Sequence, residues 1–133
     1  MPAVSHKGIL AIAAVIDVAV NAGSRPVSAK ALAVRHKLPP RHLEPVLQAL
    51  VRQGVLRGVR GPRGGYKLAR ERGDVSADDI LRAIGNGEDH LQSNSPLANN
   101  VVKPALTEAE RAFSAALARI SVADMAKQAQ PLK

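Results

Sequence analysis

The chain has 133 residues, of which 46% are apolar, with one Tyr, one Phe and no Trp or Cys. This length suits one domain with at most an appended element, and the lack of cysteine excludes disulfides, thiolate metal sites and cysteine nucleophiles. The formal charge is +8 and uneven: residues 1–72 hold 13 basic and 3 acidic side chains, and residues 73–133 hold 6 basic and 8 acidic ones. The basic half favours contact with nucleic acid or an anionic membrane surface, although a generally basic protein would give the same count.

The most apolar stretch, residues 8–20, is interrupted by Asp17 and preceded by few basic residues, which is not typical of a signal peptide. No run reaches the ~20 apolar residues that a membrane-spanning helix needs. We therefore expect a cytoplasmic protein with no membrane partner.

Three helices are predicted in the first half of the chain. Residues 5–22 have apolar side chains at helical spacing nearly all round, with Ser5 as N-cap. Residues 28–38 form a second helix that begins at Ser28 and ends before Pro39. A third, over 40–53, has a single apolar face.

Within the third helix, Pro45 cannot donate a hydrogen bond to the carbonyl of Arg41, so it should bend or delay the regular helix. Residues 55–60 and 65–69 then read as two strands joined by a glycine-rich loop, a β-hairpin. We expect Val59, Tyr66 and Leu68 to anchor this hairpin to the core. A fourth helix follows, capped by Ser76 with Asp79 in a capping box.

Residues 86–100 are rich in Asn, Ser, Gly and Pro and are predicted to be an irregular linker. The expected organisation is thus a DNA-binding domain over 1–85, a linker loop over 86–100, and a long helix with a short last helix over 101–133. The long helix has an apolar seam at steps of 4 and 3, which suits packing against the same helix of a second copy or, alternatively, against the first helix. The seam consists of Val102, Leu106, Ala109, Phe113, Ala116 and Ile120.

Three helices followed by a hairpin is the order of a winged helix-turn-helix, so the fold class is mainly α with a two-stranded β wing. The third helix would lie in the major groove of DNA, and the wing would meet phosphates and the minor groove. The expected DNA-binding residues are Ser28, Lys30, Arg41, His42, Gln48, Arg52, Arg60, Arg63, Gly64 and Lys67. Arg35, His36 and Lys37 would lie near the DNA backbone. In the loop, glycine would leave no Cβ between the wing backbone and a phosphate.

Residues 38–70, LPPRHLEPVLQALVRQGVLRGVRGPRGGYKLAR, closely resemble the recognition helix and wing of the Rrf-two family of bacterial winged-helix transcription regulators. The first helix, the SADDILRAIG helix and the long C-terminal helix occur in the family's order. The resemblance implies a homodimer on a dyad-symmetric site in double-stranded DNA, with the long helices crossed between the two copies. Family members commonly carry Tyr where this chain has His42.

The chain departs from this family in residues 86–100, where many relatives hold an iron–sulfur cluster through three cysteines. Without cysteine we expect no cofactor and no metal site, although Glu88, Asp89 and His90 are either a divalent-metal site or simply solvated. No catalytic motif is found, so no enzyme is expected. The predicted function is a dimeric DNA-binding transcription regulator, a repressor; the alternatives are a regulatory module that acts mainly through a protein partner, and one that responds to a small-molecule effector.

Overall fold

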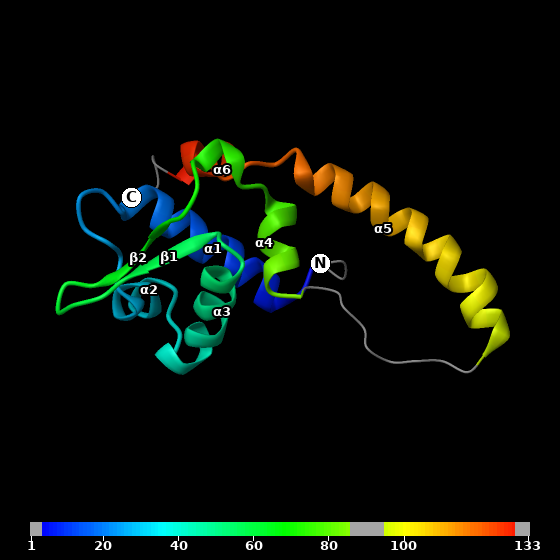
Figure 1. Ribbon diagram of the computed structural model, residues 1–133, viewed down its shortest axis with the longest axis horizontal. Coiled ribbons are helices and arrows are strands. Elements are labelled where there is room, and N and C mark those ends of the chain that lie inside the picture. Colours follow the sequence, from blue (N-terminus) through cyan, green and yellow to red (C-terminus); the bar gives the residue numbers. More distant parts are fainter. Residues whose placement is uncertain (1–3, 86–94, 130–133) are drawn as a thin grey trace.

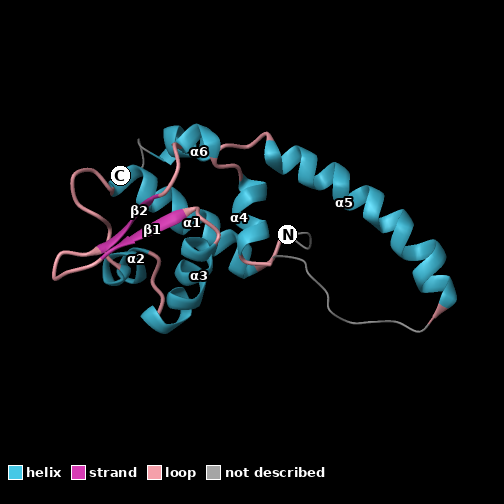
Figure 2. Cartoon of the chain, viewed as in Figure 1, coloured by secondary structure: helices cyan, strands magenta, loops and turns pink. Residues whose placement is uncertain are grey.

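The computed structural model describes residues 4–85 and 95–129. These residues form six α-helices, two short helical turns and one antiparallel two-stranded sheet, mainly α as predicted (Figures 1 and 2). In chain order the elements are α1 (His6–Asn21), α2 (Ala29–Arg35), α3 (Pro40–Arg52), β1 (Leu56–Val59), β2 (Gly65–Leu68), η1 (Arg72–Asp74), α4 (Ala77–Ala83), η2 (Ala98–Val102), α5 (Lys103–Ala118) and α6 (Val122–Ala129).

Helix α1 lies at the centre of the core, and α2, α3, α4, α6 and the sheet pack around it (Figure 1). Its alanines and valines are small enough for neighbouring helices to approach closely, while the leucines of α2 and α3 fill the space between them. The largest fully buried side chains include Val15, Val18, Leu32, Leu43, Leu47, Leu50, Leu56, Ile80 and Val122.

The helix starts predicted from serine residues are confirmed. The hydroxyl oxygens of Ser5 and Ser28 accept hydrogen bonds from the backbone N–H groups of Gly8 and Ala31, both at 3.0 Å. Ser76 and Asp79 form the reciprocal capping box, with bonds of 3.1 and 3.0 Å. Each cap satisfies backbone donors that the first turn leaves without intrahelical partners.

The second helix is shorter than predicted, because Lys37 takes a left-handed conformation with φ of 56°. The N–H of Lys37 donates to the carbonyl of Val34, and that of Leu38 donates to the carbonyl of Ala33. This is the Schellman pattern that ends helices, usually with glycine at the left-handed position. The α2–α3 turn therefore begins two residues before the Pro39–Pro40 pair that was expected to end the helix.

The third helix begins at Pro40 and continues through Pro45, so the predicted delay of regular helix is not found. Proline is compatible with the first helical position, where its missing N–H would have no intrahelical partner. One forfeited hydrogen bond at Pro45 is outweighed here by burial of Leu43, Val46 and Leu47 on the same helix, none more than 2% exposed.

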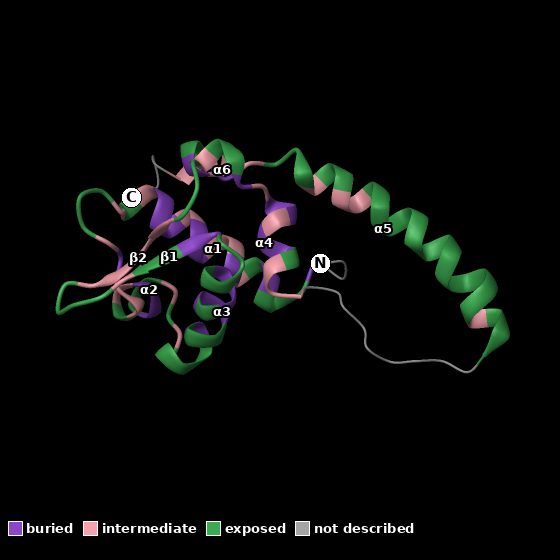
Figure 3. Cartoon of the chain, viewed as in Figure 1, coloured by how far each residue is buried: buried purple, intermediate pink, exposed green. Residues whose placement is uncertain are grey.

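The last helix packs against α1, and its residues Val122 and Ala126 are buried in the shared core. Backbone hydrogen bonds between Ala77 and Ile120 and between Val122 and Val75, each 2.8 Å, hold the start of α6 beside the start of α4. Helix α5, in contrast, extends away from this body and has no buried residue (Figure 3).

Two expectations for the C-terminal half are corrected. Residues 98–100 belong to η2, which continues directly into α5, so helical structure begins inside the segment predicted to be an irregular linker. Ile120 lies beyond the end of α5, because its backbone pairs with Ala77, and so it is not part of that helix. Residues 86–94, including Glu88, Asp89 and His90, lie outside the described part of the chain.

Candidate nucleic-acid interface

Helix α3 has one apolar face in the core and one polar face in solvent. Leu43 and Leu50 are fully buried, whereas Arg41, Gln48 and Arg52 are exposed. These three recur at i, i+7 and i+11, which places them on one side of the helix. His42 is also exposed, about 100° round the helix from Arg41.

The same polar face carries an acidic side chain that the sequence analysis did not select. Glu44 is exposed three residues after Arg41 and four before Gln48, and no ion pair joins it to residues 4–85 or 95–129. A carboxylate at such a place repels phosphates but can accept a hydrogen bond from the amino group of cytosine. Its helical spacing from Arg41 and Gln48 was the signal available in the sequence.

The two strands of the wing place two cations directly opposite each other. Leu56 pairs with Leu68, Arg57 with Lys67, Gly58 with Tyr66 and Val59 with Gly65. Directly paired residues share a face, and like charges in that position destabilise a sheet unless an anion lies between them. Arg57 is therefore a candidate that the sequence analysis missed; the alternation of the strand, with Leu56 buried, could have identified it.

The opposite face of the wing packs on the core through Tyr66 and Leu68, as expected. Val59 does not belong to this anchor, because the register puts it on the face of Arg57 and Lys67. The wing is also fixed by two backbone hydrogen bonds between Val27 and Tyr66, of 3.0 and 2.8 Å, which join it to the segment before α2. No pattern in the sequence predicted this third extended segment.

In the wing loop, Arg60 and Arg63 are exposed. Gly64 is required for a reason other than the one expected. A Cβ at Gly64 would lie 2.2 Å from the carbonyl oxygen of Val59 and 2.9 Å from that of Gly61. The absent side chain thus allows the hairpin to close on itself, whatever the loop then approaches.

On α2, Lys30 is exposed and the Ser28 hydroxyl caps the helix, so its oxygen accepts from Ala31 and its hydrogen is left to donate elsewhere. Arg35 and His36 have an acidic partner that no pattern in the sequence predicted. Both bind Asp17 of α1: Arg35 donates from Nε and Nη2 to the two carboxylate oxygens at 2.8 and 2.7 Å, and His36 Nε2 lies 3.0 Å from Oδ2.

Asp17 is the centre of this cluster, and its side chain is only 8% exposed. Burial acts to raise its pKa, but the hydrogen bonds from Arg35 and Asn21 and the charges of Arg35 and His36 outweigh burial and hold the pKa below its ordinary value. The carboxylate raises the pKa of Arg35 in turn, through the same hydrogen bond. Asp17 therefore fixes the end of α2, next to the turn that leads into α3.

Three other arginines of the described chain have partners of their own. Arg82 lies 2.8 Å from Asp78, Arg70 lies 4.0 Å from Asp79, and Arg72 donates to the backbone carbonyl of Ala19. On α3 and the wing, in contrast, no carboxylate from residues 4–85 or 95–129 binds the arginines, which are Arg41, Arg52, Arg57, Arg60 and Arg63. Lys67 has only a 3.5 Å contact with the carbonyl of Ser24.

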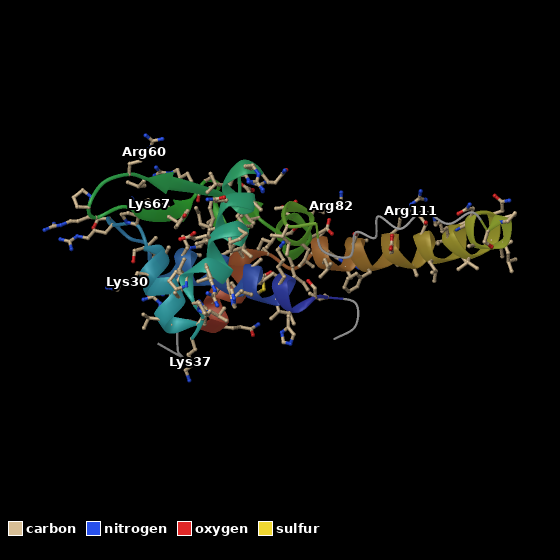
Figure 4. All side chains as sticks on the ribbon, turned by 90° about the horizontal axis from the view of Figure 1, so that it is seen from below. Lys30, Lys37, Arg60, Lys67, Arg82 and Arg111 are labelled. Atoms are coloured by element: carbon tan, nitrogen blue, oxygen red, sulfur yellow. The ribbon has the colours of Figure 1, made fainter. Side chains whose placement is uncertain are left out.

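Figure 4 shows how these cations are distributed. Lys30, Arg60 and Lys67 lie at the end of the molecule that carries the wing, whereas Arg111 lies on α5 toward the opposite end. The unpaired cations of α2, α3 and the wing therefore gather at one end, as the charge asymmetry of the sequence suggested.

The predicted seam of α5 is largely open to solvent in the single chain. Val102 and Leu106 are 44% and 59% exposed, Ala109 and Ala116 are exposed, and only Phe113 is half-buried. Val102 lies in η2 and Ile120, 42% exposed, lies past the end of the helix. The most extensive contacts of α5 with the body are to α4, and not to α1, which was the alternative for this seam.

The described residues contain no group of three histidine or acidic side chains placed to hold a metal ion. The 133 residues also offer no thiolate, so they do not fit an iron–sulfur cluster held by cysteines. Within residues 4–85 and 95–129, no helix has the length and apolarity needed to cross a bilayer.

Three helices around a shared core, the third with an exposed polar face, and a following antiparallel hairpin define a winged helix-turn-helix protein. The chain belongs to the Rrf2 family, whose model, described as an iron-dependent transcriptional regulator, matches residues 4–128. The resemblance found in the sequence is confirmed.

Among curated proteins, the chain is 32% identical over 85 residues to the HTH-type transcriptional regulator IscR of Cronobacter sakazakii. The aligned residues make up 64% of this chain and 52% of that protein. The match to IscR of an Enterobacter strain is similar, at 31%. The chain thus spans about half the length of the curated relatives it matches. They are transcriptional regulators, not enzymes.

Solved structures match over more of the chain. IscR of T. potens is 33% identical with a TM-score of 0.75, covering 97% of this chain and 89% of that one. CymR, titled the global cysteine regulator of B. subtilis, is 25% identical with a TM-score of 0.70, covering 93% and 95%.

Proposed function

We propose that this chain is a homodimeric, sequence-specific DNA-binding transcription regulator that acts as a repressor without a cysteine-held cluster. The observation that supports this best is that five arginines of α3 and the wing have no carboxylate partner in the described chain, whereas Arg35, Arg70 and Arg82 do. Such cations raise affinity for a phosphate backbone by releasing its counterions.

In this proposal α3 enters the major groove, with Arg41, Gln48 and Arg52 directed at base edges. Arginine binds guanine through two parallel hydrogen bonds, and glutamine binds adenine in the same way. Arg57 and Lys67 together hold one phosphate, because an anion between them relieves the repulsion of two directly paired cations. Arg63, in the wing loop, reaches the minor groove.

The second copy in the proposal covers the apolar side of η2 and α5. Leu97, Val101, Val102 and Leu106 are 67%, 57%, 44% and 59% exposed, so a single chain leaves four large apolar side chains in water here. Two such helices, each contributing this surface, would bury it against each other. We expect Leu106→Lys to convert a dimer to a monomer in sedimentation, and Arg111→Gln, across the same helix, to leave it a dimer.

The test of DNA binding begins with selection of bound fragments from genomic DNA by the full chain at a stated salt concentration. A dyad-symmetric consensus is the expected result. Affinity for the selected duplex is then measured across salt concentrations for wild type, Arg63→Gln and Arg57→Gln. Arg57→Gln should reduce the slope of log affinity against log salt by about 0.9, the value for one phosphate contact. Arg63→Gln should lower affinity for the selected duplex, because it removes the cation assigned to the minor groove.

The matched control is Arg111→Gln, which makes the same charge change at the opposite end of the molecule. It should leave the slope unchanged. If all three variants lose affinity equally, the protein binds through its net charge and the wing has no specific role. If wild type selects no consensus and binds no duplex at low salt, the proposed function is wrong.

A further inference from the structure

An open groove lies beside the recognition helix and shares Arg41 with the surface assigned to base contact. It is bounded by the first two turns of α1, the α2–α3 turn and the first half of α3, and its volume is about 710 Å³. This volume falls in the range of small-molecule sites, roughly 300–1,000 Å³. The lining residues are His6, Lys7, Ile9, Leu10, Ala13, His36, Leu38, Arg41, His42, Pro45 and Val46.

The floor of the groove is apolar. Ile9, Leu10, Ala13, Leu38, Pro45 and Val46 supply it, from three different segments of the fold. Ile9 is 44% exposed although it lies on the central core helix, so part of this floor is in water in the single chain. Covering such a surface with the apolar body of a ligand is favourable.

The rim of the groove is cationic. His6 and Lys7 lie at one side and Arg41 and His42 at the other, and no acidic side chain lines the groove. None of these four side chains is hydrogen-bonded or ion-paired with another residue of the described chain. Asp17 does not neutralise them, because it is already bound by Arg35, Asn21 and His36. Glu44, one helical turn from Arg41, does not line the groove.

We propose that this groove binds a small amphipathic carboxylate, with its apolar body on the floor and its head group between Arg41 and Lys7. The guanidinium of Arg41 presents a planar pair of donors that matches a carboxylate, and Lys7 adds a second positive charge. DNA does not explain the floor, because base and phosphate contacts need no continuous apolar surface on α1. The groove is thus a ligand site next to the recognition helix.

A carboxylate bound in the groove would oppose DNA binding, an effect that rests on the proposed function. Arg41 and His42 line the groove and also belong to the polar surface of α3 assigned to DNA. A carboxylate bound to Arg41 neutralises a charge that would otherwise meet a phosphate or a guanine. Coupling between two sites is reciprocal, so duplex DNA must weaken carboxylate binding by the same factor.

The test uses the purified full chain without DNA and decanoate as the probe, below its aggregation concentration, by calorimetry and thermal shift. Decanoate should bind with one site per chain and raise the melting temperature. Acetate, which has the head group alone, and decyltrimethylammonium, which has the tail with the opposite charge, should do neither. Equal binding of decyltrimethylammonium would overturn the site, since any detergent-like molecule would then serve.

Two variants outside the proposed DNA contacts locate the site. Ile9→Gln removes part of the floor and Lys7→Gln part of the rim, and each should weaken decanoate binding about tenfold. The control for Ile9→Gln is Val34→Gln, because Val34 is also a β-branched apolar residue and is 70% exposed outside the groove. The control for Lys7→Gln is Lys127→Gln on α6. Both control variants should bind decanoate as wild type does. Equal affinities across all four variants would overturn the proposal.

The other possible occupant is a second copy of the chain. If Ile9→Gln changes the sedimentation of the protein and decanoate does not bind wild type, the groove is a protein interface and the ligand proposal is wrong. If decanoate binds but leaves the affinity for duplex DNA unchanged, the groove is a ligand site and the proposed effect on DNA binding is wrong. Failure of the protein to bind any duplex would refute the proposed function while the calorimetric result for the groove stands.

Discussion

Removing either partner of the Asp17–Arg35 ion pair should destabilise the protein, but by different amounts. The Asp17 side chain is 8% exposed and the Arg35 side chain 44%. Arg35→Met leaves a buried carboxylate with only Asn21 and His36 as donors, whereas Asp17→Asn leaves an arginine that water already reaches. We therefore expect Arg35→Met to destabilise the protein more than Asp17→Asn, although the two remove the same pair.

The magnitude follows from the two exposures. Breaking a fully buried ion pair by removing one partner costs roughly 3–5 kcal/mol. Because Arg35 is nearly half in solvent and two donors to Asp17 remain, we expect about 2 kcal/mol for Arg35→Met. Asp17→Asn keeps an acceptor for Arg35 and removes the buried charge, so about 1 kcal/mol is expected.

Urea unfolding at neutral pH measures both values, with the slope m required to stay constant so that the midpoint reports the free energy of unfolding. For a chain of this length, each kcal/mol should lower the melting temperature by about 4 °C. The refuting result is an Asp17→Asn variant that is as unstable as Arg35→Met or more so. It would mean that the charge of Asp17, and not its burial, determines the cost.

The pH dependence follows with a definite sign. The pKa of Asp17 is lower in the folded protein than its ordinary value of 3.8. The unfolded chain therefore binds its proton at higher pH than the folded chain does, so the stabilisation is complete well above pH 3.8 and is lost as pH falls through that value toward the folded pKa. Asp17→Asn should reduce the fall in the free energy of unfolding over this pH range. If the fall is the same as in wild type, other carboxylates produce it.

Three further changes test local features of the fold. Lys37→Gly should leave stability equal or up to about 1 kcal/mol higher in urea unfolding, because glycine removes left-handed strain but gains freedom when unfolded; a clear loss would show that the lysine side chain contributes contacts. Gly64→Ala should cost about 2 kcal/mol or more, since its Cβ would meet the carbonyl of Val59, and a melting temperature equal to that of wild type would contradict this. Ser76→Ala should cost about 1 kcal/mol, because the capping box that starts α4 is lost, and Ser76→Thr should restore most of it.

The sequence predicted the features that depend on near neighbours along the chain. Ser5, Ser28 and Ser76 cap helices because a hydroxyl three residues before a free N–H can reach it in any context. The strands of the wing were placed to within two residues for the same reason, since glycines and a proline separate two short apolar runs.

Features that depend on pairing between distant residues were missed. Asp17 reads in the sequence as an interruption of an apolar helix, and only the fold brings Arg35, 18 residues away, to its carboxylate. The bridge between Val27 and Tyr66 is of the same kind. Neither is signalled by periodicity, because periodicity states which face of an element is apolar and not which residue lies opposite.

This distinction changes what the charge of the chain means. A count assigns +10 to residues 1–72, but Arg35 within that count is bound to Asp17, Arg70 lies beside Asp79 and Arg72 is held by the carbonyl of Ala19. The cations without a carboxylate partner in the described chain include Lys30 on α2, Arg41 and Arg52 on α3, and Arg57, Arg60, Arg63 and Lys67 on the wing. Asp17 thus holds the 44% exposed guanidinium of Arg35 at the end of α2 through two hydrogen bonds, and this arginine is not a free cation. The surface available to DNA is therefore smaller than the sequence suggests and more sharply confined to one end of the molecule.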